Sequence, residues 1–190
     1  MQKIPTIFER DWEGDRSRVL DQPVSGTEWV FEGEGNALRK YDGTCVMFDG
    51  EKWWARREVK DGKTPPPGFV SSGHDHITLK NVGWEPVEQS PFWKFMQEAA
   101  MNWSAANLTG EKMEPGTYEL IGPKIQGNPE KEETHLLVRH DSCEGVGNLD
   151  RTYEGIQTFL SENDWEGIVF HHQDGRRMAK IKKRDFGLRR

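Results

Sequence analysis

The chain has 190 residues, of which 34% are hydrophobic and 31% are charged, and its formal net charge is −6. The length suits a single domain, which we assign to residues 1–190 with residues 1–26 as an N-terminal extension. Eight Trp and nine Phe argue against a disordered chain, because burying so much aromatic surface offsets the entropy lost on folding. No apolar run is long enough for a membrane span or a signal peptide, so we expect a cytoplasmic protein without membrane contacts.

The predicted elements of the first half are mainly short strands. Residues 28–31 are the first candidate. Residues 44–48, a two-residue turn at Asp49-Gly50 and a return through residues 53–59 have the pattern of a hairpin. The Thr-Pro-Pro-Pro-Gly stretch at residues 64–68 can form neither a helix nor a central strand, so we assign it to a loop.

One helix stands out after these strands. Ser90 is a suitable N-cap and Pro91 suits the first helical position, where a missing N–H costs nothing. Apolar residues then recur at helical spacing as far as about Asn107. We assign this stripe to the core: Phe92, Phe95, Met96, Ala99, Ala100 and Trp103.

The second half adds strands at residues 117–121 and 135–138, a helix at 153–160, and a hairpin of residues 167–171 and 177–183. Strands dominate and helices do not alternate with them, so the predicted class is α+β with mostly antiparallel sheet.

Basic residues gather in the last fifteen positions, against the single acidic residue Asp185: Arg176, Arg177, Lys180, Lys182, Lys183, Arg184, Arg189 and Arg190. The distribution of charge says more about partners than the net charge does. A basic C-terminal strand and tail at residues 176–190 suits a phosphate-rich ligand, while a solvated terminus is the alternative.

Lys40 is the first candidate for chemistry, in the Lys-Tyr-Asp-Gly stretch at residues 40–43. A lysine acts as a nucleophile only after losing its proton, which requires burial or nearby cations that lower its pKa. Asp42 could hold a divalent metal, and Gly43 would let the backbone approach a ligand closely. A charged surface turn is the alternative.

Glu166, Lys180 and Lys182 form a second group, on the hairpin that turns at Asp174-Gly175. The two lysines lie on one face of their strand and would repel each other unless an anion, such as a triphosphate, sat between them. They would also lower the pKa of a neighbouring lysine, as Lys40 requires. The alternative is an exposed edge strand that lysines protect. Glu119, in the Tyr-Glu pair at residues 118–119, is a third candidate, for a ribose hydroxyl or a metal-bound water.

Together these stretches resemble the covalent nucleotidyltransferase superfamily of polynucleotide ligases and capping enzymes. Residues 40–43 are similar to its motif I, 118–119 to motif III, 166–169 to motif IV and 180–182 to motif V, in the order of the family. A closer similarity is to the family that includes the animal 5′-to-3′ RNA ligase. It runs from about residue 38 to the C-terminus, through these stretches: 40–45, 54–56, 83–88, 119–129, 135–137 and 166–188.

The resemblance implies a ligase adenylylation domain without an OB-fold domain, using ATP and Mg²⁺ or Mn²⁺ to join RNA 5′-phosphate and 3′-hydroxyl ends, as in RNA repair. Lys40 would take AMP from ATP as a lysyl-AMP intermediate, with Lys180 and Lys182 on the α-phosphate. Asp42 and Glu166 would hold the metal. Arg56 would contact ribose or phosphate, and Glu119 would contact ribose.

Other readings remain open. A capping enzyme or DNA ligase carries the same motifs, and a non-catalytic RNA-binding module could keep the scaffold. Six histidines raise the question of a zinc site, but they lack supporting Cys or a His-x-x-x-His pattern, so we do not predict one. The pattern does not predict an oligomeric state.

Overall fold

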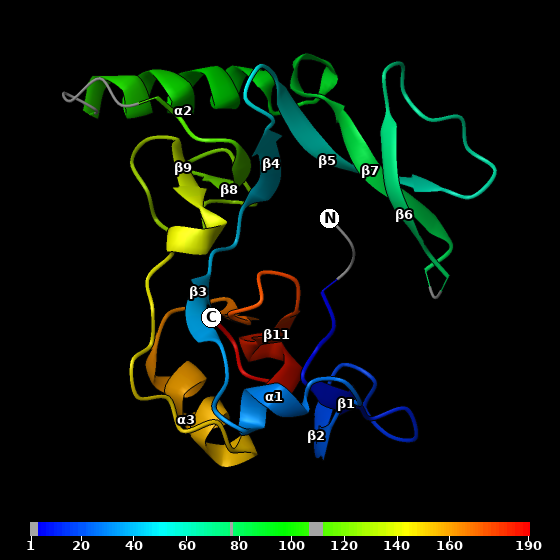
Figure 1. Cartoon of the computed structure of the whole chain (residues 1–190), viewed down its shortest axis with the longest axis vertical. Coiled ribbons are helices and arrows are strands. Elements are labelled where there is room, and N and C mark those ends of the chain that lie inside the picture. The colour runs from blue at the N-terminus through cyan, green and yellow to red at the C-terminus, as the bar shows by residue number, and fades with distance from the viewer. Residues whose placement is uncertain (1–3, 77, 107–111) are drawn as a thin grey trace. The chain divides into compact units, whose positions relative to one another are not determined.

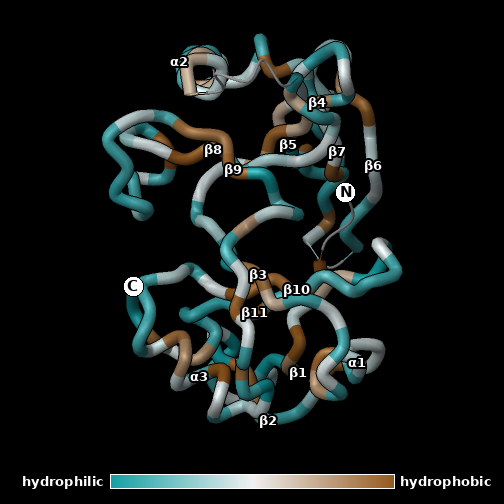
Figure 2. The backbone as a smooth tube through the Cα atoms, turned by 60° about the vertical axis from the view of Figure 1, so that its left-hand side comes forward, coloured by the Kyte–Doolittle hydropathy of each residue, from teal (hydrophilic) through white to brown (hydrophobic). Residues whose placement is uncertain are grey.

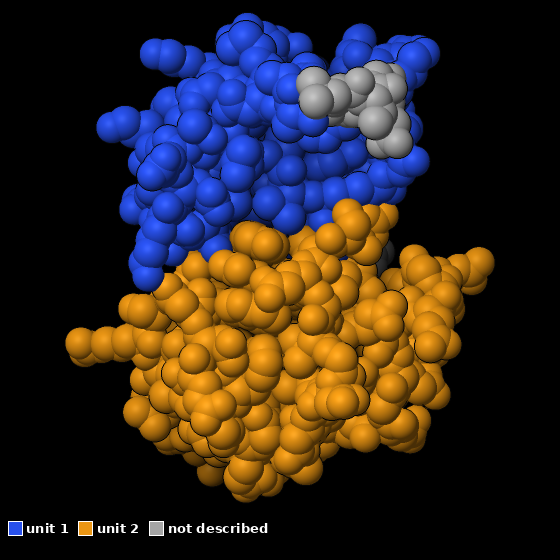
Figure 3. Space-filling model, turned by 90° about the vertical axis from the view of Figure 1, so that its left-hand side faces the viewer, with its two compact units in different colours: residues 1–3, 42–140 blue, residues 4–41, 141–190 orange. Residues whose placement is uncertain are grey.

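The computed structural model describes residues 4–76, 78–106 and 112–190, and it has the α+β class that the sequence predicts, with antiparallel pairing between its named strands. The chain divides into two compact units (Figure 3): unit 1 contains residues 42–140, and unit 2 contains residues 4–41 and 141–190. Each unit is described by itself, and the single-domain assignment stays a prediction. Among the described residues, no helix combines the length and the apolar character that a membrane crossing needs.

Unit 2 is built on a three-stranded sheet of order β11-β10-β3. The strands are β3 (Asn36–Lys40), β10 (Gly167–His171) and β11 (Met178–Lys182). A two-stranded sheet of β1 (Phe8–Arg10) and β2 (Val19–Pro23) belongs to the same unit. The predicted hairpin of β10 and β11 is therefore confirmed, and β10 is the central strand of the three-stranded sheet.

The helices of unit 2 contribute apolar side chains to the same core as its strands. Figure 1 shows the helices and strands of the chain as ribbons. In α3 (Tyr153–Glu162), the Thr152 side chain accepts the Gly155 N–H at 3.1 Å as an N-cap, and Ile156 and Leu160 are fully buried one turn apart. These residues join Ile168 and Phe170 of β10 in one core. Figure 2 shows apolar residues along β10 and β11. A short 3-10 helix, η3 (Lys183–Phe186), follows β11, and its Phe186 is also buried in this core.

Unit 1 contains a six-stranded sheet of order β6-β7-β5-β4-β8-β9. The strands are β4 (Thr44–Phe48), β5 (Trp53–Lys60), β6 (Val70–Asp75), β7 (Lys80–Pro86), β8 (Gly116–Ile121) and β9 (Leu136–Arg139). Short 3-10 helices, η1 (Val87–Gln89) and η2 (His140–Ser142), follow β7 and β9.

Helix α2 (Trp93–Ala106) covers one face of the unit 1 sheet. Its Met96 and Ala99 are buried against Val46, Ala55 and Leu120 of three neighbouring strands, and Phe92, Phe95 and Ala100 pack partly buried against the same cluster. The predicted core stripe is therefore confirmed except for Trp103, which is half-buried outside this cluster. The regular helix begins two residues after the predicted Pro91, although the Ser90 hydroxyl does accept the Phe92 N–H at 3.3 Å. The predicted end at Asn107 lies outside the described residues.

The strand predicted at residues 28–31 is wrong, because these residues form the short helix α1 (Glu28–Phe31). Trp29 and Val30 favour strands by propensity, but tertiary contacts override that preference. The Arg151 guanidinium donates to the carbonyl of Val30 at 3.0 Å and to the carbonyl of Gly35 at 2.7 Å. The first bond adds a donor to a carbonyl in the last turn of the helix, and the second holds the segment that follows it.

The sequence prediction also misses β1, β2, β3, β6 and β7. Strands β1 and β2 lie in the segment assigned to an extension, yet Ile7, Phe8 and Val19 are buried in the core of unit 2. Their polar neighbours obscure the alternation in the sequence.

The hairpin of β4 and β5 is confirmed, but the predicted two-residue turn at Asp49-Gly50 is wrong, because four residues, 49–52, lie between the paired strands. The Asp49 carboxylate accepts the Lys52 N–H, the Trp54 indole N–H and the Glu51 N–H at 2.7, 2.7 and 2.8 Å. These bonds, in that order, lower the pKa of Asp49 to about 2. The carboxylate therefore organises the turn.

We expect the Asp49 carboxyl to titrate near pH 2 in an NMR titration of side-chain carboxyl carbons. Because the pKa is lowered by folding, the stability that this group contributes is present above the ordinary aspartate range and is lost as the pH falls through 2. A midpoint in the ordinary range would contradict the bonding described for this turn.

Candidate active site

The sheet of unit 2 brings Lys40, Glu166 and Lys182 together. Lys40 ends β3 and Lys182 ends β11, and both are cross-strand partners of Gly167, the first residue of the central strand β10. Side chains at directly paired positions lie on the same face of a sheet, so the two lysines face the same way. Glu166 directly precedes Gly167. Strand pairing thus joins side chains that are 126 positions apart in the sequence.

The Glu166 carboxylate lies between the two ammonium groups. Its Oε2 accepts a hydrogen bond from Lys40 Nζ at 2.5 Å, and its Oε1 accepts one from Lys182 Nζ. The three side chains are only 20%, 12% and 18% exposed in chain order. The sequence analysis expects an anion between Lys180 and Lys182, which stays a prediction; the anion that the structure shows lies between Lys40 and Lys182 and is a side chain of the protein itself.

The two lysines determine the ionisation of Glu166. Burial is the largest single influence and raises the pKa of Glu166, but the charges of Lys40 and Lys182, with their hydrogen bonds, together outweigh it and lower that pKa overall. The carboxylate is therefore ionised at neutral pH. Its contribution to stability is present above the ordinary glutamate range and is lost as the pH falls through the lowered pKa.

Gly167 has no room for a side chain. A Cβ atom at this position would lie 2.2 Å from the Ile181 carbonyl oxygen and 2.9 Å from the Lys182 Cα. The backbones of β10 and β11 therefore approach each other closely beside the Glu166 carboxylate, and glycine is the residue that allows it.

The residues beside Lys40 are fixed by the Arg39 side chain. Its guanidinium lies 4.4 Å from the centre of the Tyr41 ring and 5.5 Å from that of Trp165, and it pairs with the Glu144 carboxylate at 3.2 Å. Stacking and ion pairing together restrain the end of β3 where Lys40 is attached.

Lys180 and Lys182 are both half-buried and alternate with buried residues, so they share one face of β11 as the sequence predicts. β11 is an edge strand of its three-stranded sheet, but the backbone bonds at Lys180 do not favour the alternative of an open edge. The Lys180 N–H donates to the Pro5 carbonyl at 2.9 Å, and the Lys180 carbonyl accepts the Ile7 N–H at 3.0 Å. The N-terminal segment therefore covers this edge, and edge protection does not account for the two lysines.

Glu119 and the turn before β4 meet in unit 1. The Gly43 N–H donates to Glu119 Oε1 at 3.1 Å, and the Asp42 N–H donates to Glu130 Oε1 at 2.8 Å. A Cβ atom on Gly43 would lie 2.3 Å from the Leu120 carbonyl oxygen. Glycine is therefore required at position 43 because the backbone there comes close to strand β8. The sequence analysis expected the backbone to come close to a ligand.

Arg56 shares a face of the unit 1 sheet with Glu119. Cys45 pairs with Glu119 across β4 and β8, and Met47 pairs with Trp54 across β4 and β5. Because side chains two residues apart in a strand lie on the same face, Arg56 follows Trp54 onto the face of Cys45 and Glu119. Asp42 belongs to this unit and Glu166 to unit 2, and the metal site predicted for those two carboxylates stays a prediction.

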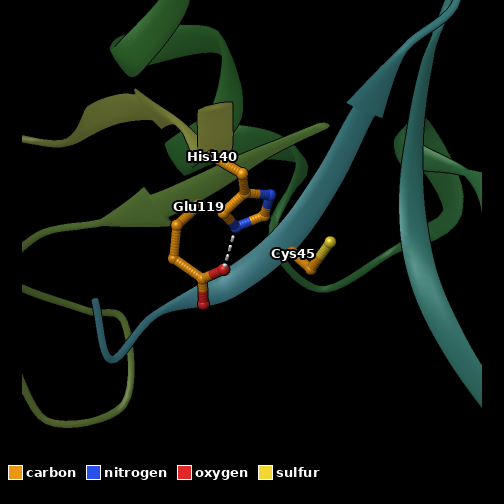
Figure 4. A group of neighbouring side chains, drawn as sticks. All are labelled: Cys45, Glu119 and His140. Carbon is orange, nitrogen blue, oxygen red and sulfur yellow. Dashed lines mark hydrogen bonds and ion pairs between the residues drawn. The ribbon is translucent and has the colours of Figure 1, made fainter. Parts of the chain in front are cut away.

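His140 is a neighbour of Glu119 that the sequence analysis misses. Its Nε2 lies 2.8 Å from Glu119 Oε2, and its Nδ1 lies 3.0 Å from Thr117 Oγ1. Cys45 lies beside them (Figure 4). No spacing in the sequence indicates this group, because it depends on the pairing of β8 with both β4 and β9.

No protein-family model and no curated protein matches the sequence. Among solved structures, the chain is similar to a mutant of RNA ligase R4a from Naegleria gruberi in its apo form, with 15% identity and a TM-score of 0.42. The match covers 96% of this chain and 61% of the ligase chain. A likeness of this degree carries no argument about the present chain.

We expect Glu166→Gln to lower the free energy of unfolding by about 1–3 kcal/mol at pH 7, because two partly buried ammonium groups then lack their counter-charge. The difference from the wild type should shrink as the pH falls through the lowered pKa of Glu166. Guanidinium chloride denaturation over a pH series measures it. The control is Glu162→Gln, at an exposed position of α3. Equal stability of Glu166→Gln and wild type at pH 7 would contradict the pairing.

Proposed function

We propose that the chain is an ATP-dependent RNA ligase that joins a 5′-phosphate to a 3′-hydroxyl through a lysyl-AMP intermediate on Lys40. The observation that carries the proposal is the Glu166 carboxylate between Lys40 and Lys182. The sequence resemblance assigns these residues separately to motifs I, IV and V. Their meeting on three adjacent strands is an independent geometric result, and it supports a common site in unit 2.

In the first step, the deprotonated amine of Lys40 attacks the α-phosphorus of ATP. A nitrogen–phosphorus bond forms as the bond to pyrophosphate breaks, so that AMP stays on the lysine. Such transfers depend on alignment and charge neutralisation more than on further covalent chemistry. Lys182 and Lys180, on one face of β11, supply positive charge for the phosphate oxygens.

Glu166 would position the nucleophile before ATP binds. Its hydrogen bond to Lys40 Nζ, at 2.5 Å, restrains a flexible side chain at the end of β3. Attack requires the amine to give up both this bond and a proton. An incoming phosphate that draws Lys182 away from Glu166 would disrupt the arrangement in which one carboxylate holds both lysines. Nucleotide binding would in this way be linked to activation of Lys40.

Mg²⁺ or Mn²⁺ is the metal that the resemblance implies. Asp42 and Glu166 offer carboxylate oxygens, the donors that these hard cations prefer. The donor chemistry fits, although both Glu166 oxygens accept lysine hydrogen bonds and at least one of those bonds must be exchanged for the metal. The ion, when bound, would neutralise phosphate charge.

The remaining two steps pass AMP to the RNA 5′-phosphate and then expel it as the 3′-hydroxyl attacks. In unit 1, Glu119 and Arg56 share a sheet face and are the groups that the resemblance assigns to ribose and phosphate. The exposed arginines near the C-terminus would contact the RNA backbone.

The proposal predicts that wild-type protein incubated with α-³²P-labelled ATP and Mg²⁺ or Mn²⁺ acquires a covalent label. Lys40→Ala should abolish it, because no amine remains to bond to phosphorus. Lys182→Ala should lower the rate by about 10²-fold or more, as is typical when a group that stabilises transition-state charge is removed.

Lys60→Ala, at an exposed position of β5, is the matched control and should label like the wild type. Excess unlabelled GTP should compete poorly, which distinguishes ATP use from the capping-enzyme alternative. Full labelling of a folded Lys40→Ala variant would end the proposal.

RNA binding should depend on the exposed arginines Arg176, Arg184 and Arg189. For single-stranded RNA, each lost phosphate contact should reduce the slope of log K against log salt by about 0.7. Replacing all three by Gln should therefore weaken binding and flatten the slope, as measured by fluorescence anisotropy over a salt series.

The matched control removes the same charge from exposed lysines of unit 1, as Lys52→Gln, Lys60→Gln and Lys63→Gln together. Equal slopes for the arginine variant and the wild type would show that these arginines do not contact the RNA backbone.

A further inference from the structure

In unit 1, a thiol and an imidazole that the proposed ligase reaction does not use lie beside the Glu119 carboxylate. The thiol sulfur of Cys45, a carboxylate oxygen of Glu119 and a ring nitrogen of His140 all lie within 4.8 Å of one another (Figure 4). The Glu119 side chain is 10% exposed and that of His140 is 25% exposed. We propose that Cys45, Glu119 and His140 bind a divalent ion of the Zn²⁺ class.

The pairing of three neighbouring strands of the sheet, β4, β8 and β9, brings these side chains together. Cys45 on β4 and Glu119 on β8 are direct cross-strand partners, so their side chains leave the sheet side by side. His140 comes directly after Arg139, the last residue of β9, which pairs with Tyr118 of β8. Each donor is therefore attached at or next to a strand of the same sheet, and a rigid support favours a defined coordination geometry.

Thr117 orients the imidazole of His140. Its Oγ1 lies 3.0 Å from Nδ1, and the other nitrogen, Nε2, lies 2.8 Å from Glu119 Oε2. In the tautomer that binds a metal, Nδ1 carries the proton and donates a hydrogen bond to Thr117 Oγ1, so that Nε2 presents a lone pair on the side of Glu119 and Cys45. Metal-binding histidines are commonly oriented by such a bond from the second ring nitrogen.

The mixture of donors identifies the class of metal. Thiolate and imidazole select Zn²⁺ and related transition metals, whereas Mg²⁺ and Ca²⁺ prefer oxygen ligands alone. Three protein ligands of this kind leave one position of a tetrahedral zinc ion for water or another ligand. As the metal–sulfur bond forms, the Cys45 thiol releases its proton to solvent. The His140–Glu119 hydrogen bond requires a proton on Nε2, so this bond breaks as the imidazole changes to the tautomer with its proton on Nδ1, and both groups then bind the metal.

Metal binding itself does not rest on the proposed function. One consequence of it does rest on that function. Because Glu119 is also assigned to the ribose of ATP, a bound Zn²⁺-class ion would withdraw this carboxylate from the nucleotide. Metal binding is therefore measured without ATP, and its failure would leave the proposed ligase reaction untouched.

Co²⁺ is the probe, because a cobalt–thiolate bond gives a near-ultraviolet charge-transfer band and tetrahedral Co²⁺ gives visible bands. When Co²⁺ is titrated into the full chain, both the near-ultraviolet band and the visible bands should appear. Added Zn²⁺ should remove these bands because it displaces Co²⁺ from the site. Cys45→Ser should lose the thiolate band, and Cys143→Ser, the matched control, should keep it. Thr117→Val keeps all three ligands and should weaken binding by about tenfold or more, as expected for a group that orients a ligand.

A second measurement needs no variant. In the wild-type chain, Zn²⁺ should protect Cys45, but not Cys143, from alkylation by iodoacetamide, as read by mass spectrometry of peptides. The proposal is overturned if Co²⁺ gives no thiolate band in the wild type, if a folded Cys45→Ser variant keeps that band, or if Zn²⁺ leaves the alkylation of Cys45 unchanged.

Discussion

One carboxylate, that of Glu166, is hydrogen-bonded to the ammonium groups of both Lys40 and Lys182. All three side chains are largely withdrawn from water, where an uncompensated charge would be costly. Two cations and one anion leave a net positive charge at the ends of β3 and β11. Such a site suits a ligand that brings negative charge of its own, and a nucleoside triphosphate has that character.

The rest of unit 2 keeps these groups in place. Residues 5–7 cover the outer edge of β11, and residues 144–146 bond to β3 through the Arg39 N–H and the Val146 N–H. Gly167 lets β10 and β11 approach closely next to Glu166. The sheet is therefore supported on both edges by chain segments distant in sequence, and the three charged side chains are attached to backbone that packing restrains.

Unit 1 presents different chemistry, because its Cys45 and His140 add a sulfur and a nitrogen donor beside the Glu119 carboxylate.

Local sequence patterns predict an element correctly where the signal for that element lies within a few residues. The hairpin at residues 44–60, the apolar stripe of α2 and the alternation of Lys180 and Lys182 were all predictable from such signals. Residues 28–31 are misassigned because long-range contacts override their strand propensity, among them the bond from Arg151, remote in sequence, to the Val30 carbonyl. The bond of Lys40 to Glu166 and the grouping of Cys45 with His140 depend on which strands pair. Strand order is a long-range property, and no spacing in a single sequence encodes it.

The central claim is that Lys40 alone among these clustered lysines bonds to the nucleotide. Incubating wild-type protein with ATP and Mg²⁺, digesting it with a protease that does not cleave at lysine, and mapping the product by tandem mass spectrometry tests this directly. We expect one AMP per chain, attached to Nζ of Lys40. AMP on Lys180 or Lys182, or a folded chain that acquires no AMP with either Mg²⁺ or Mn²⁺, would contradict it.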